Sequence, residues 1–563
     1  MHIGIVGSGP SAIYAIQRLL TSGTPLDITV FEAGQRAGVG TPYDPGTTPL
    51  YMLANIASVE VPRVAETLHD YLSRCDDALL KTIGVERSEM TERTFHPRVA
   101  LGAYYAAQLS SLCDIAAVQG HQVTVLTSCR VTDIAPDGRG VRIISERETS
   151  GVTRQWFDKI ILATGHTVPV TRRFSPPTFD KPVSRGQSFG VLGSSLSAID
   201  IAMSLAMERG AFENADYHLN AEQSPFTITM MSRAGRLPEA DFYCPLPAMP
   251  LPGFGEEDVQ AIVERSEKGQ ILDAVFMQFA RLLAAEDPSY AARINLARLT
   301  ADTFAQAYFA PRDTQHPLQW ASTNLAETLQ NAAGKLTVPW RYTILRCHEA
   351  FSTCLKALDH DELERFDRGL KKVFIDNYAA VPPRSIERLL ALHRAGVFDI
   401  VKLGKDYRLD VDDSDGRVTI TTGSSAIMVD AMFDGRGQAG ADDDDFPFPT
   451  LRFLLKSNQD LRADARESSA IQVDDEYRLA GGLNPLRNIW CLSLPFLLDR
   501  QPFIQGLTSA AKLGHAAADD ILADGNACSA EPDISLGDLA AVVHGSAPVF
   551  VNGNLVILTQ KSA

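Results

Sequence analysis

The stretch HIGIVGSGPSA, residues 2–12, decides the fold of this chain. Residues 2–6 form a short apolar run typical of a buried strand, and residues 7–12 follow the pattern G-x-G-x-x-A that opens a helix. A second apolar strand, residues 27–31, ends at Glu32. This order of strand, glycine turn, helix, strand and acid predicts a dinucleotide-binding unit, in which Glu32 accepts hydrogen bonds from ribose hydroxyls.

The geometry of a dinucleotide-binding turn explains why each of these positions holds a small residue. Gly7 allows the tight turn, Gly9 lets the backbone approach a pyrophosphate, and Ala12 lets the helix pack closely on the strand. Pro10 and Ser11 begin the helix, whose free N–H groups attract phosphate. The alternative is a glycine turn in an α/β domain that binds no nucleotide.

Four later strands complete the first unit. We expect three of them to form a meander and the fourth to return to the sheet and end at a glycine turn. Ala163 and Gly165 of that turn are predicted to border the cofactor. Val131 is predicted to contact the adenine through its backbone, with core packing as the alternative. The strands are residues 123–125, 131–134, 141–144 and 159–162, and the turn spans residues 163–166.

The same plan then recurs, which is the strongest organisational signal in the chain. Residues 189–192 form a strand that leads into a second glycine turn and helix. Another strand, residues 226–231, follows. The second meander is read in residues 398–437, with strands at 399–401, 407–411 and 417–420. The candidate cofactor residues of this copy are Gly193, Ser194, Ser195, Ser197 and Arg233.

Two features of the second copy bear on its coenzyme. Ser195 stands where the middle glycine is expected, and its side chain could hinder the approach of a pyrophosphate. The strand 226–231 ends at Ser232-Arg233 and not at an acid. A guanidinium pairs with a 2′-phosphate in a bidentate fashion, so the sequence predicts a preference for NADPH.

Between the two parts of the second copy lie residues 251–397, where apolar residues recur at helical spacing. We expect this mainly helical insertion to cover an active site or to form a subunit interface in a homo-oligomer. The helical stretches are 258–264, 271–285, 319–333, 343–357, 360–376 and 384–395. The predicted parts are an FAD-binding domain at 1–170 and 438–525, an NAD(P)-binding domain at 171–250 and 398–437, the insertion, and a C-terminal tail at 526–563.

Composition excludes several classes of function. The 563 residues carry 52 Lys and Arg against 69 Asp and Glu, a net charge of -17, which disfavours nucleic acid and anionic membranes as partners. We find no signal peptide and no apolar run near the roughly 20 residues of a membrane span, and expect a cytoplasmic protein. The eight scattered cysteines form no C-x-x-C, and the aspartate run 442–445 is typical of a solvated loop, so no metal site is predicted.

Several segments resemble those of flavoproteins with two dinucleotide-binding domains. Within that group the chain is most similar to flavin-dependent N-hydroxylating monooxygenases, among them the aspartate N-monooxygenases that form nitrosuccinate. The similar segments are 40–43, 53–56, 95–105, the turn 163–166, and 232–238.

The resemblance implies FAD on the first unit, NADPH on the second, and oxygen transfer from a flavin C4a-hydroperoxide to the nitrogen of a small amine or amino acid. One alternative is an FAD and NAD(P)H oxidoreductase that passes electrons to an acceptor without inserting oxygen. A third is a flavin-binding regulator without catalysis. The absence of a suitably spaced cysteine pair argues against a disulfide reductase.

The resemblance also suggests residues near the flavin and the substrate. It places Asn55 beside the isoalloxazine, where its amide would bond the ring or the substrate; a turn-capping role is the alternative. Arg98 would bind a phosphate or an acidic substrate, or simply begin a helix. Arg63 and Arg500 are the other arginines near these motifs, and Gln501 follows the second of them.

A late glycine-started helix begins near residue 505. Its dipole suits the pyrimidine end of the flavin, so Gln505, Gly506 and Leu507 are predicted cofactor contacts. His166 follows the first return turn and lies either near the flavin or on the surface.

Overall fold

The structure is a computed structural model of the whole chain. It describes residues 1–137, 140–165, 187–412, 414, 416–423, 425–437, 445–460, 471, 473–479, 484–498, 501–504, 506–527, 548–551 and 554–557.

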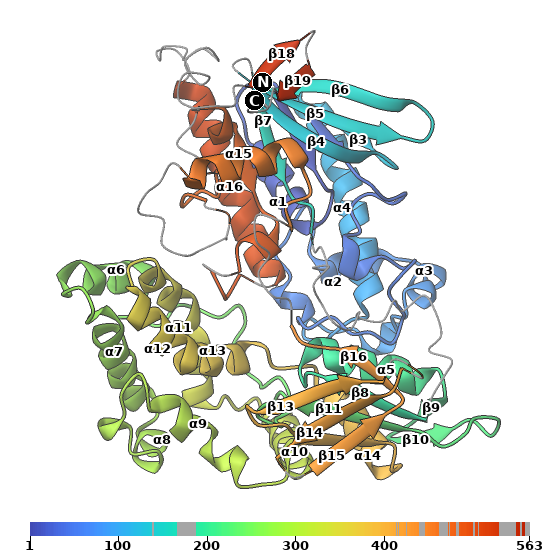
Figure 1. Ribbon diagram of the computed structural model, residues 1–563, viewed down its shortest axis with the longest axis vertical. Helices are drawn as coiled ribbons and strands as arrows, with labels where there is room; N and C mark the ends of the chain where they lie inside the picture. Colours follow the sequence, from blue (N-terminus) through green and yellow to red (C-terminus); the bar gives the residue numbers. More distant parts are fainter. Residues whose placement is uncertain are drawn as a thin grey trace, which may run out of the picture.

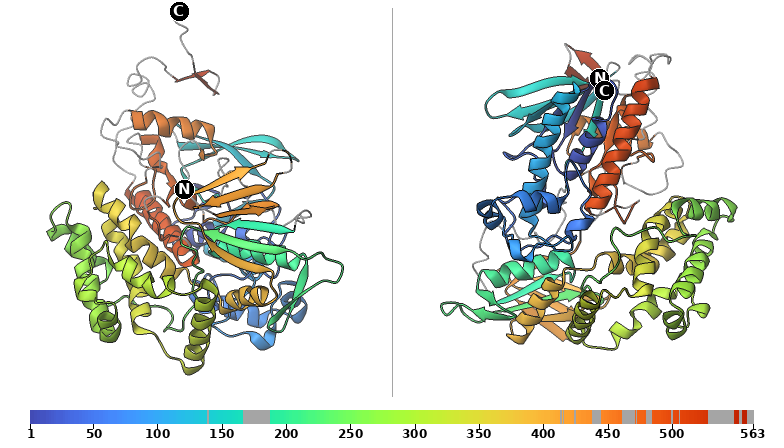
Figure 2. Two further views of the ribbon diagram at one scale, coloured as in Figure 1. Left: turned by 60° about the horizontal axis from the view of Figure 1, so that its bottom comes forward. Right: turned by 180° about the vertical axis from the view of Figure 1, so that it is seen from behind.

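The first module is built on a parallel sheet of five strands in the order β17-β7-β1-β2-β3 (Figure 1). Strand β17 comes from far along the chain and pairs with β7. Helices α1 and α16 lie side by side (Figure 2). They are so close that a Cβ on Gly514 would lie 2.7 Å from the backbone of α1. The elements are β1 His2–Val6, α1 Pro10–Leu19, β2 Asp27–Phe31, α2 Leu68–Arg74, α3 Asp77–Thr82, α4 Arg98–Gln119, β3 Gln122–Leu126, β7 Lys159–Leu162, α15 Pro449–Asp460, β17 Ile489–Cys491 and α16 Leu507–Ala527.

A three-stranded antiparallel sheet accompanies the parallel one, and its membership corrects the sequence prediction. The strand at 123–125 is β3 of the parallel sheet and not the first meander strand. The third meander strand is β6, which the sequence analysis missed because most of its side chains are polar or exposed. The meander consists of β4 Arg130–Asp137, β5 Gly140–Arg147 and β6 Gly151–Phe157.

The second module repeats this plan, as predicted. Its parallel sheet has the order β12-β11-β8-β16, and a second antiparallel meander, β13-β14-β15, packs beside it. The same error recurs, since the strand at 399–401 is β12 of the parallel sheet and the missed β15 completes the meander. The strands are β8 Ser188–Leu192, β11 Thr227–Ser232, β12 Phe398–Lys402, β13 Tyr407–Val411, β14 Val418–Thr422, β15 Ser425–Val429 and β16 Ala431–Asp434. Helix α5 spans Leu196–Met207, and β9 Gly210–Glu213 and β10 Asp216–Leu219 form a hairpin. Two α/β units with parallel sheets confirm the predicted fold class.

A helical module lies to one side of the second sheet (Figure 1) and has a core rich in phenylalanine. The predicted helix 360–376 is two helices that break at Gly369. The helices of this module are α6 Glu256–Arg265, α7 Ile271–Glu286, α8 Pro288–Arg293, α9 Phe304–Asp313, α11 Pro339–Leu355, α12 His360–Arg368 and α13 Leu370–Tyr378. Two further helices, α10 Pro317–Gly334 and α14 Pro383–Arg394, contribute instead to the core of the second module.

The helical module is joined to the second module by a buried ionic network. Arg341 lies 2.7 Å from Glu239, and Arg312 lies 2.6 Å from Asp376. Both arginines are almost fully buried, and Arg312 also donates to the carbonyl of Leu237. Removing one partner of a buried pair costs about 3–5 kcal/mol, so this junction is rigid.

The helical module also contacts the first module through Phe503, in the loop before α16. This ring is 6% exposed and lies in the helical core. Its centroid is 5.8 Å from that of Phe374, 5.9 Å from that of Tyr378 and 6.1 Å from that of His348. The loop is therefore anchored by aromatic packing.

Near the end of the chain, β18 Pro548–Val551 and β19 Asn554–Ile557 pair in antiparallel fashion. Among the described helices, none combines the length and apolar character needed to cross a membrane.

We expect Phe503→Ala to lower the free energy of unfolding of the helical module by about 3–5 kcal/mol, because it leaves a cavity among aromatic rings. Urea denaturation followed by circular dichroism measures this. Phe453→Ala is the matched control, since that ring is 41% exposed. Equal urea midpoints for the two variants would contradict the anchoring role.

Candidate functional site

The first glycine turn is fixed by a close backbone approach. Gly7 has φ +99°, and a Cβ there would lie 2.1 Å from the carbonyl oxygen of Ala163. Its N–H donates to the carbonyl of Phe31 at 2.8 Å. No other residue fits this position, and the turn delivers the N-terminus of α1 to the carboxyl edge of the sheet.

The N-terminus of α1 is open to a ligand. Gly9 is the N-cap residue and Pro10 the first helical residue, with no side chain capping the helix. Among the described atoms, a Cβ on Gly9 would meet only the Cα of Gly40, at 3.5 Å. The N–H groups of Ser11 and Ala12 lack partners within the helix and suit a pyrophosphate.

Glu32 is held in place by a serine that sequence analysis did not select. The hydroxyl of Ser8 donates to one carboxylate oxygen of Glu32 at 2.5 Å, and the N–H of Gly34 donates to the other at 2.6 Å. Ser8 is 1% exposed and accepts from the N–H of Gly38. A carboxylate oxygen has two lone pairs, so Glu32 remains able to accept hydrogen bonds from ribose. The feature of the sequence that could have identified Ser8 is its position between Gly7 and Gly9.

The second glycine turn has the same construction. Gly193 has φ +124°, and a Cβ there would lie 2.5 Å from the carbonyl oxygen of Gly435. The hydroxyl of Ser194 lies 2.9 Å from that of Ser232 and 2.6 Å from the carbonyl of Arg236. Ser194 thus corresponds to Ser8, since each ties its turn to the end of the neighbouring strand in the sheet.

Ser195 and Ser197 lie at the exposed start of α5. Ser195 is its N-cap residue, yet its hydroxyl caps no backbone N–H of the helix. The side chain is therefore available to donate to a phosphate. Arg233 follows β11 and is exposed, and its carbonyl accepts from the N–H of Gly404 at 3.1 Å.

The return turns of the two modules differ for a packing reason. In the second module a Cβ on Gly435 would lie 2.8 Å from the Cα of Ala198, so glycine replaces the alanine found at residue 163. The neighbouring Asp434 is 1% exposed and pairs with Arg436 at 2.8 Å. The Asp-Gly-Arg-Gly sequence therefore reflects tighter contact between α5 and the return strand.

In the first module, the return turn is bonded to the end of β17. The N–H of Thr164 donates to Ser493 at 3.1 Å. Ala163 is buried, whereas Gly165 is exposed with φ +72°. Val131 lies in the meander strand β4, partly buried and paired with Ser145.

Asn55 belongs to a patch of buried polar atoms that lack partners. Its Oδ1 has no hydrogen-bond partner among the described residues, and the same holds for Ser58 Oγ, His69 Nδ1 and His96 Nε2. Burial lowers the pKa of His96 to about 4, so its ring is neutral at physiological pH. Buried polar atoms need a ligand or water as a partner, and the amide and carbonyl groups of a flavin would fit.

Arg98 joins the first module to the second. At the start of α4, it lies 2.7 Å from Asp200 of α5 and donates to the carbonyl of Leu53. Burial raises the pKa of the Asp200 carboxyl, against the opposing effect of Arg98. Arg388 makes a second link by donating to the carbonyl of Tyr51 at 2.8 Å. A substrate would have to share Arg98 with Asp200.

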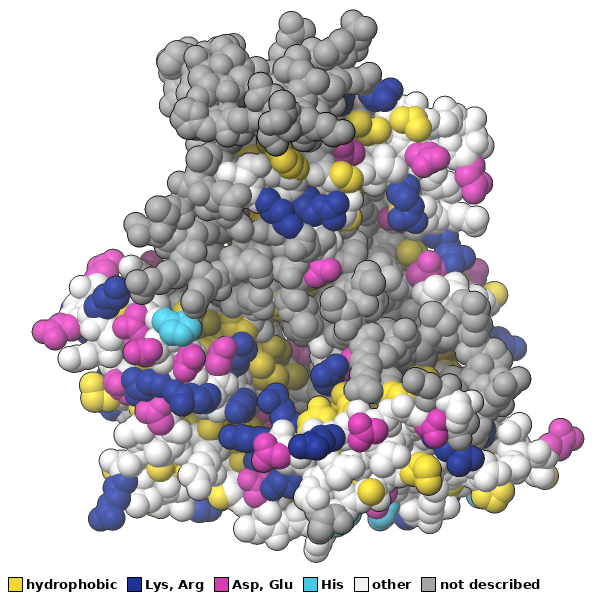
Figure 3. All heavy atoms as spheres, viewed as in Figure 1, with side chains coloured by type: hydrophobic (Ala, Val, Ile, Leu, Met, Phe, Trp, Pro, Cys, Tyr) yellow, Lys and Arg dark blue, Asp and Glu magenta, His cyan; other side chains and the backbone are white. Residues whose placement is uncertain are grey.

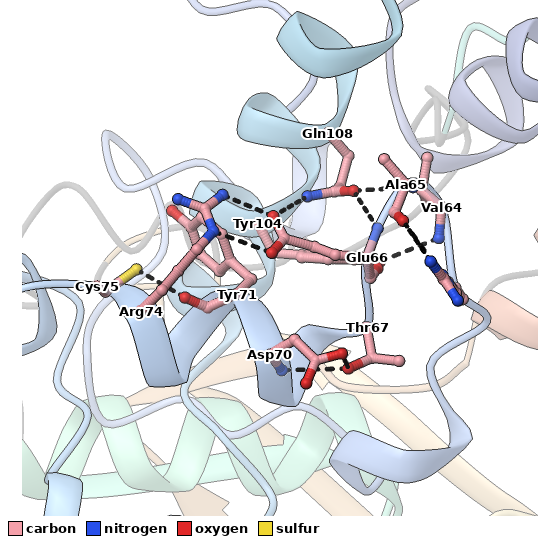
Figure 4. Close-up of polar contacts among 11 residues, drawn as sticks. Val64, Ala65, Glu66, Thr67, Asp70, Tyr71, Arg74, Cys75, Tyr104 and Gln108 are labelled. Carbon is pink, nitrogen blue, oxygen red and sulfur yellow. Dashed lines mark hydrogen bonds and ion pairs between the residues drawn. The ribbon is translucent and has the colours of Figure 1, made fainter. Parts of the chain in front are cut away.

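Arg63 is exposed and is turned onto its own loop, at the point where Figure 4 shows Gln108 facing the backbone of Ala65. Its guanidinium donates to the carbonyl of Ala65 at 3.0 and 3.1 Å. The loop is pinned to α4, because Gln108 accepts from the N–H groups of Ala65 and Glu66 while Glu66 pairs with Arg74. This geometry gives Arg63 a structural role.

The remaining predicted residues lie near α16 or outside the described part of the chain. Leu507 begins α16 and is buried, and Gly506 before it is exposed with φ +126°. Arg500, Gln505 and His166 lie outside the described residues.

Comparisons with known proteins agree with this construction. Residues 4–167 match the family described as FAD-NAD(P)-binding, which confirms the first module as an FAD/NAD(P)-binding domain. Residues 255–378, which hold the helical module, match the family described as YdhS-like middle domain.

Solved structures align along most of the chain at low identity. Ornithine N-hydroxylase KtzI of Kutzneria sp. 744 aligns over 93% of this chain and 99% of its own, with 14% identity and a TM-score of 0.47. The bacillithiol disulfide reductase Bdr of Bacillus cereus aligns over 93% and 100%, with 11% identity and a TM-score of 0.42.

A curated relative covers nearly the whole length. The uncharacterized protein YdhS of Escherichia coli strain K12 is 38% identical over 530 residues, which cover 92% of this chain and 96% of that protein. The chain therefore belongs to the YdhS family, and it carries both an FAD-NAD(P)-binding match and a YdhS-like middle domain match.

Proposed function

We propose that this protein is an FAD- and NADPH-dependent monooxygenase that oxidises the nitrogen of a small polar amine. The observation that carries the proposal is the pair of matching glycine turns. Each opens a helix, and each is tied by a serine, Ser8 or Ser194, to the end of the neighbouring strand in its sheet. One chain thus offers two dinucleotide sites, as a hydride donor and a flavin require.

The residues of the first module fit FAD. Glu32 would hold the ribose, and the N–H groups of Ser11 and Ala12 would hold the pyrophosphate. Asn55, with its unpartnered Oδ1, would bond the ring or the substrate. Bound FAD would supply hydride acceptance and oxygen activation, with the balance amine + O2 + NADPH + H+ giving hydroxylamine + NADP+ + water.

The work of the protein is then to exclude water and to bind the amine in its neutral form. The helical module, which packs on the second module and on the loop at Phe503, is suited to shield the site. No catalytic base is needed for attack by an uncharged nitrogen.

The cysteines favour this reaction over thiol redox chemistry. All seven described cysteines are free. Burial raises the pKa of Cys244 to about 12 and that of Cys491 to about 11, and it raises the pKa of Cys347 and Cys354 as well. Such thiols are poor nucleophiles at neutral pH.

L-Aspartate, with nitrosuccinate as the product, is the specific substrate that the segments around Asn55 and Arg98 suggest. Its carboxylates would need cationic partners in a shielded pocket, because an unpaired buried charge is costly. Since Arg98 already pairs with Asp200, aspartate binding would rearrange this pair or use another arginine.

We expect the purified protein to carry one FAD per chain, released by acid precipitation. Glu32→Ala should weaken FAD binding by about tenfold or more, since it removes a charged acceptor of ribose hydrogen bonds. Fluorescence titration of the flavin-free protein measures the affinity, with Glu257→Ala on exposed α6 as the control. Colourless protein that cannot be reconstituted would defeat the proposal.

NADPH should be preferred over NADH. Arg233→Ala should raise KM for NADPH by about tenfold or more and leave KM for NADH unchanged, because only the 2′-phosphate loses its partner. Steady-state flavin reduction measures both constants. The exposed Arg298 gives the control variant Arg298→Ala. Equal use of both coenzymes by the unmodified protein would rule out this assignment.

Oxygen should enter the product. With 18O2, NADPH and a panel of amines that includes L-aspartate, we expect a labelled hydroxylamine, nitroso or nitro product and little free H2O2. Mass spectrometry of the products and a peroxide assay provide the measurements. NADPH oxidation without labelled product for any amine would move the assignment to an oxidoreductase that passes electrons to another acceptor.

A further inference from the structure

Two cations of the second module follow neighbouring strands at the carboxyl edge of its sheet. Arg233 follows β11, and Lys405 follows β12, the neighbouring parallel strand. The two strand ends are joined by backbone hydrogen bonds, from Leu403 to Ser232 at 2.9 Å and from Gly404 to Arg233 at 3.1 Å. Ligands of such sheets bind outside this edge.

A lysine of the helical module faces the same edge. Asp376 of α13 binds Arg312, which in turn donates to the carbonyl of Leu237 at 2.6 Å. Lys372 lies one turn before Asp376 on the same face of α13. The buried ionic network therefore directs this face of the helix toward the segment that follows Arg233.

The charges at this junction are not balanced. Arg236 is already bound in bidentate fashion by Asp313. Within the described part of the chain, no carboxylate lies within ion-pair distance of Arg233, Lys372 or Lys405. Burial, followed by the charges of Arg233, Lys405 and Arg236, lowers the pKa of Lys372.

Figure 3 shows Lys and Arg side chains gathered on this face, between the helical module and the second sheet. In a chain with a net charge of -17, such a cluster is unusual. Holding like charges together without a counter-charge is unfavourable, so the cluster is suited to a bound anion.

We propose that Lys372 of the helical module completes, with Arg233 and Lys405, the binding site for the 2′-phosphate of NADPH. The inference rests on the proposed use of NADPH by the second module. A phosphate monoester carries up to two negative charges and three acceptor oxygens, which match one guanidinium and two ammonium groups. The helical module is then part of the coenzyme site and not only its cover.

The test uses isothermal titration calorimetry on the full-length protein with two probes, adenosine 2′,5′-bisphosphate and adenosine 5′-monophosphate. Lys372→Ala should weaken binding of the bisphosphate by about three- to tenfold and leave binding of the monophosphate unchanged. Lys372→Arg should restore most of the affinity. Lys371→Ala, one residue earlier and already paired with Asp367, is the matched control and should behave as the unmodified protein.

The outcomes separate this inference from the proposed function. If Arg233→Ala weakens bisphosphate binding while Lys372→Ala does not, the second module binds the phosphate alone and the role of Lys372 is wrong. If the unmodified protein does not prefer the bisphosphate, the NADPH assignment and the role of Lys372 both fail. A missing oxygenated product has no bearing on either binding measurement, so failure of the oxygenase proposal is recognised separately.

Discussion

In the first and the second module alike, the backbone at the end of the first strand lies against the backbone at the end of the return strand. A Cβ at Gly7 would lie 2.1 Å from the oxygen of residue 163, and one at Gly193 would lie 2.5 Å from the oxygen of residue 435. Only glycine allows this approach. The turn that follows brings a helix N-terminus to the carboxyl edge of the sheet, so the electrostatics of both candidate sites depend on this contact.

Much of this arrangement could be predicted from sequence because it is local. The glycine turns, the helices after them and the repeat of the whole plan are coded within a few residues of one another. Sheet membership is not local, which is why β3 and β12 were assigned to the meanders. Strand β6 alternates too weakly to be seen, since residues 151–156 are mostly exposed. The break at Gly369 was missed because the apolar spacing continues across it.

The candidate site was predictable to the same extent. The residues of the turns were found, but the partners that hold them were not, because those contacts join distant parts of the chain. Arg98 and Asp200 lie 102 positions apart in the sequence, and their ion pair links the two modules. A sequence pattern marks Arg98 as the start of a helix and carries no information on the acid that faces it.

The helical module is fixed at two places, and one helix serves both. Phe374 of α13 contacts Phe503, which anchors the loop before α16. Asp376 of the same helix binds Arg312 of α9, which in turn donates to the carbonyl of Leu237 in the second module. Lys372 lies one turn before Asp376 on this helix. Because α13 packs in a single aromatic core, one close-packed element holds both contacts. In the proposed enzyme, α13 therefore joins the loop at the flavin end of the first module to the phosphate end of the coenzyme site. In that proposal, a middle domain placed between two halves of the second module would take part in coenzyme binding.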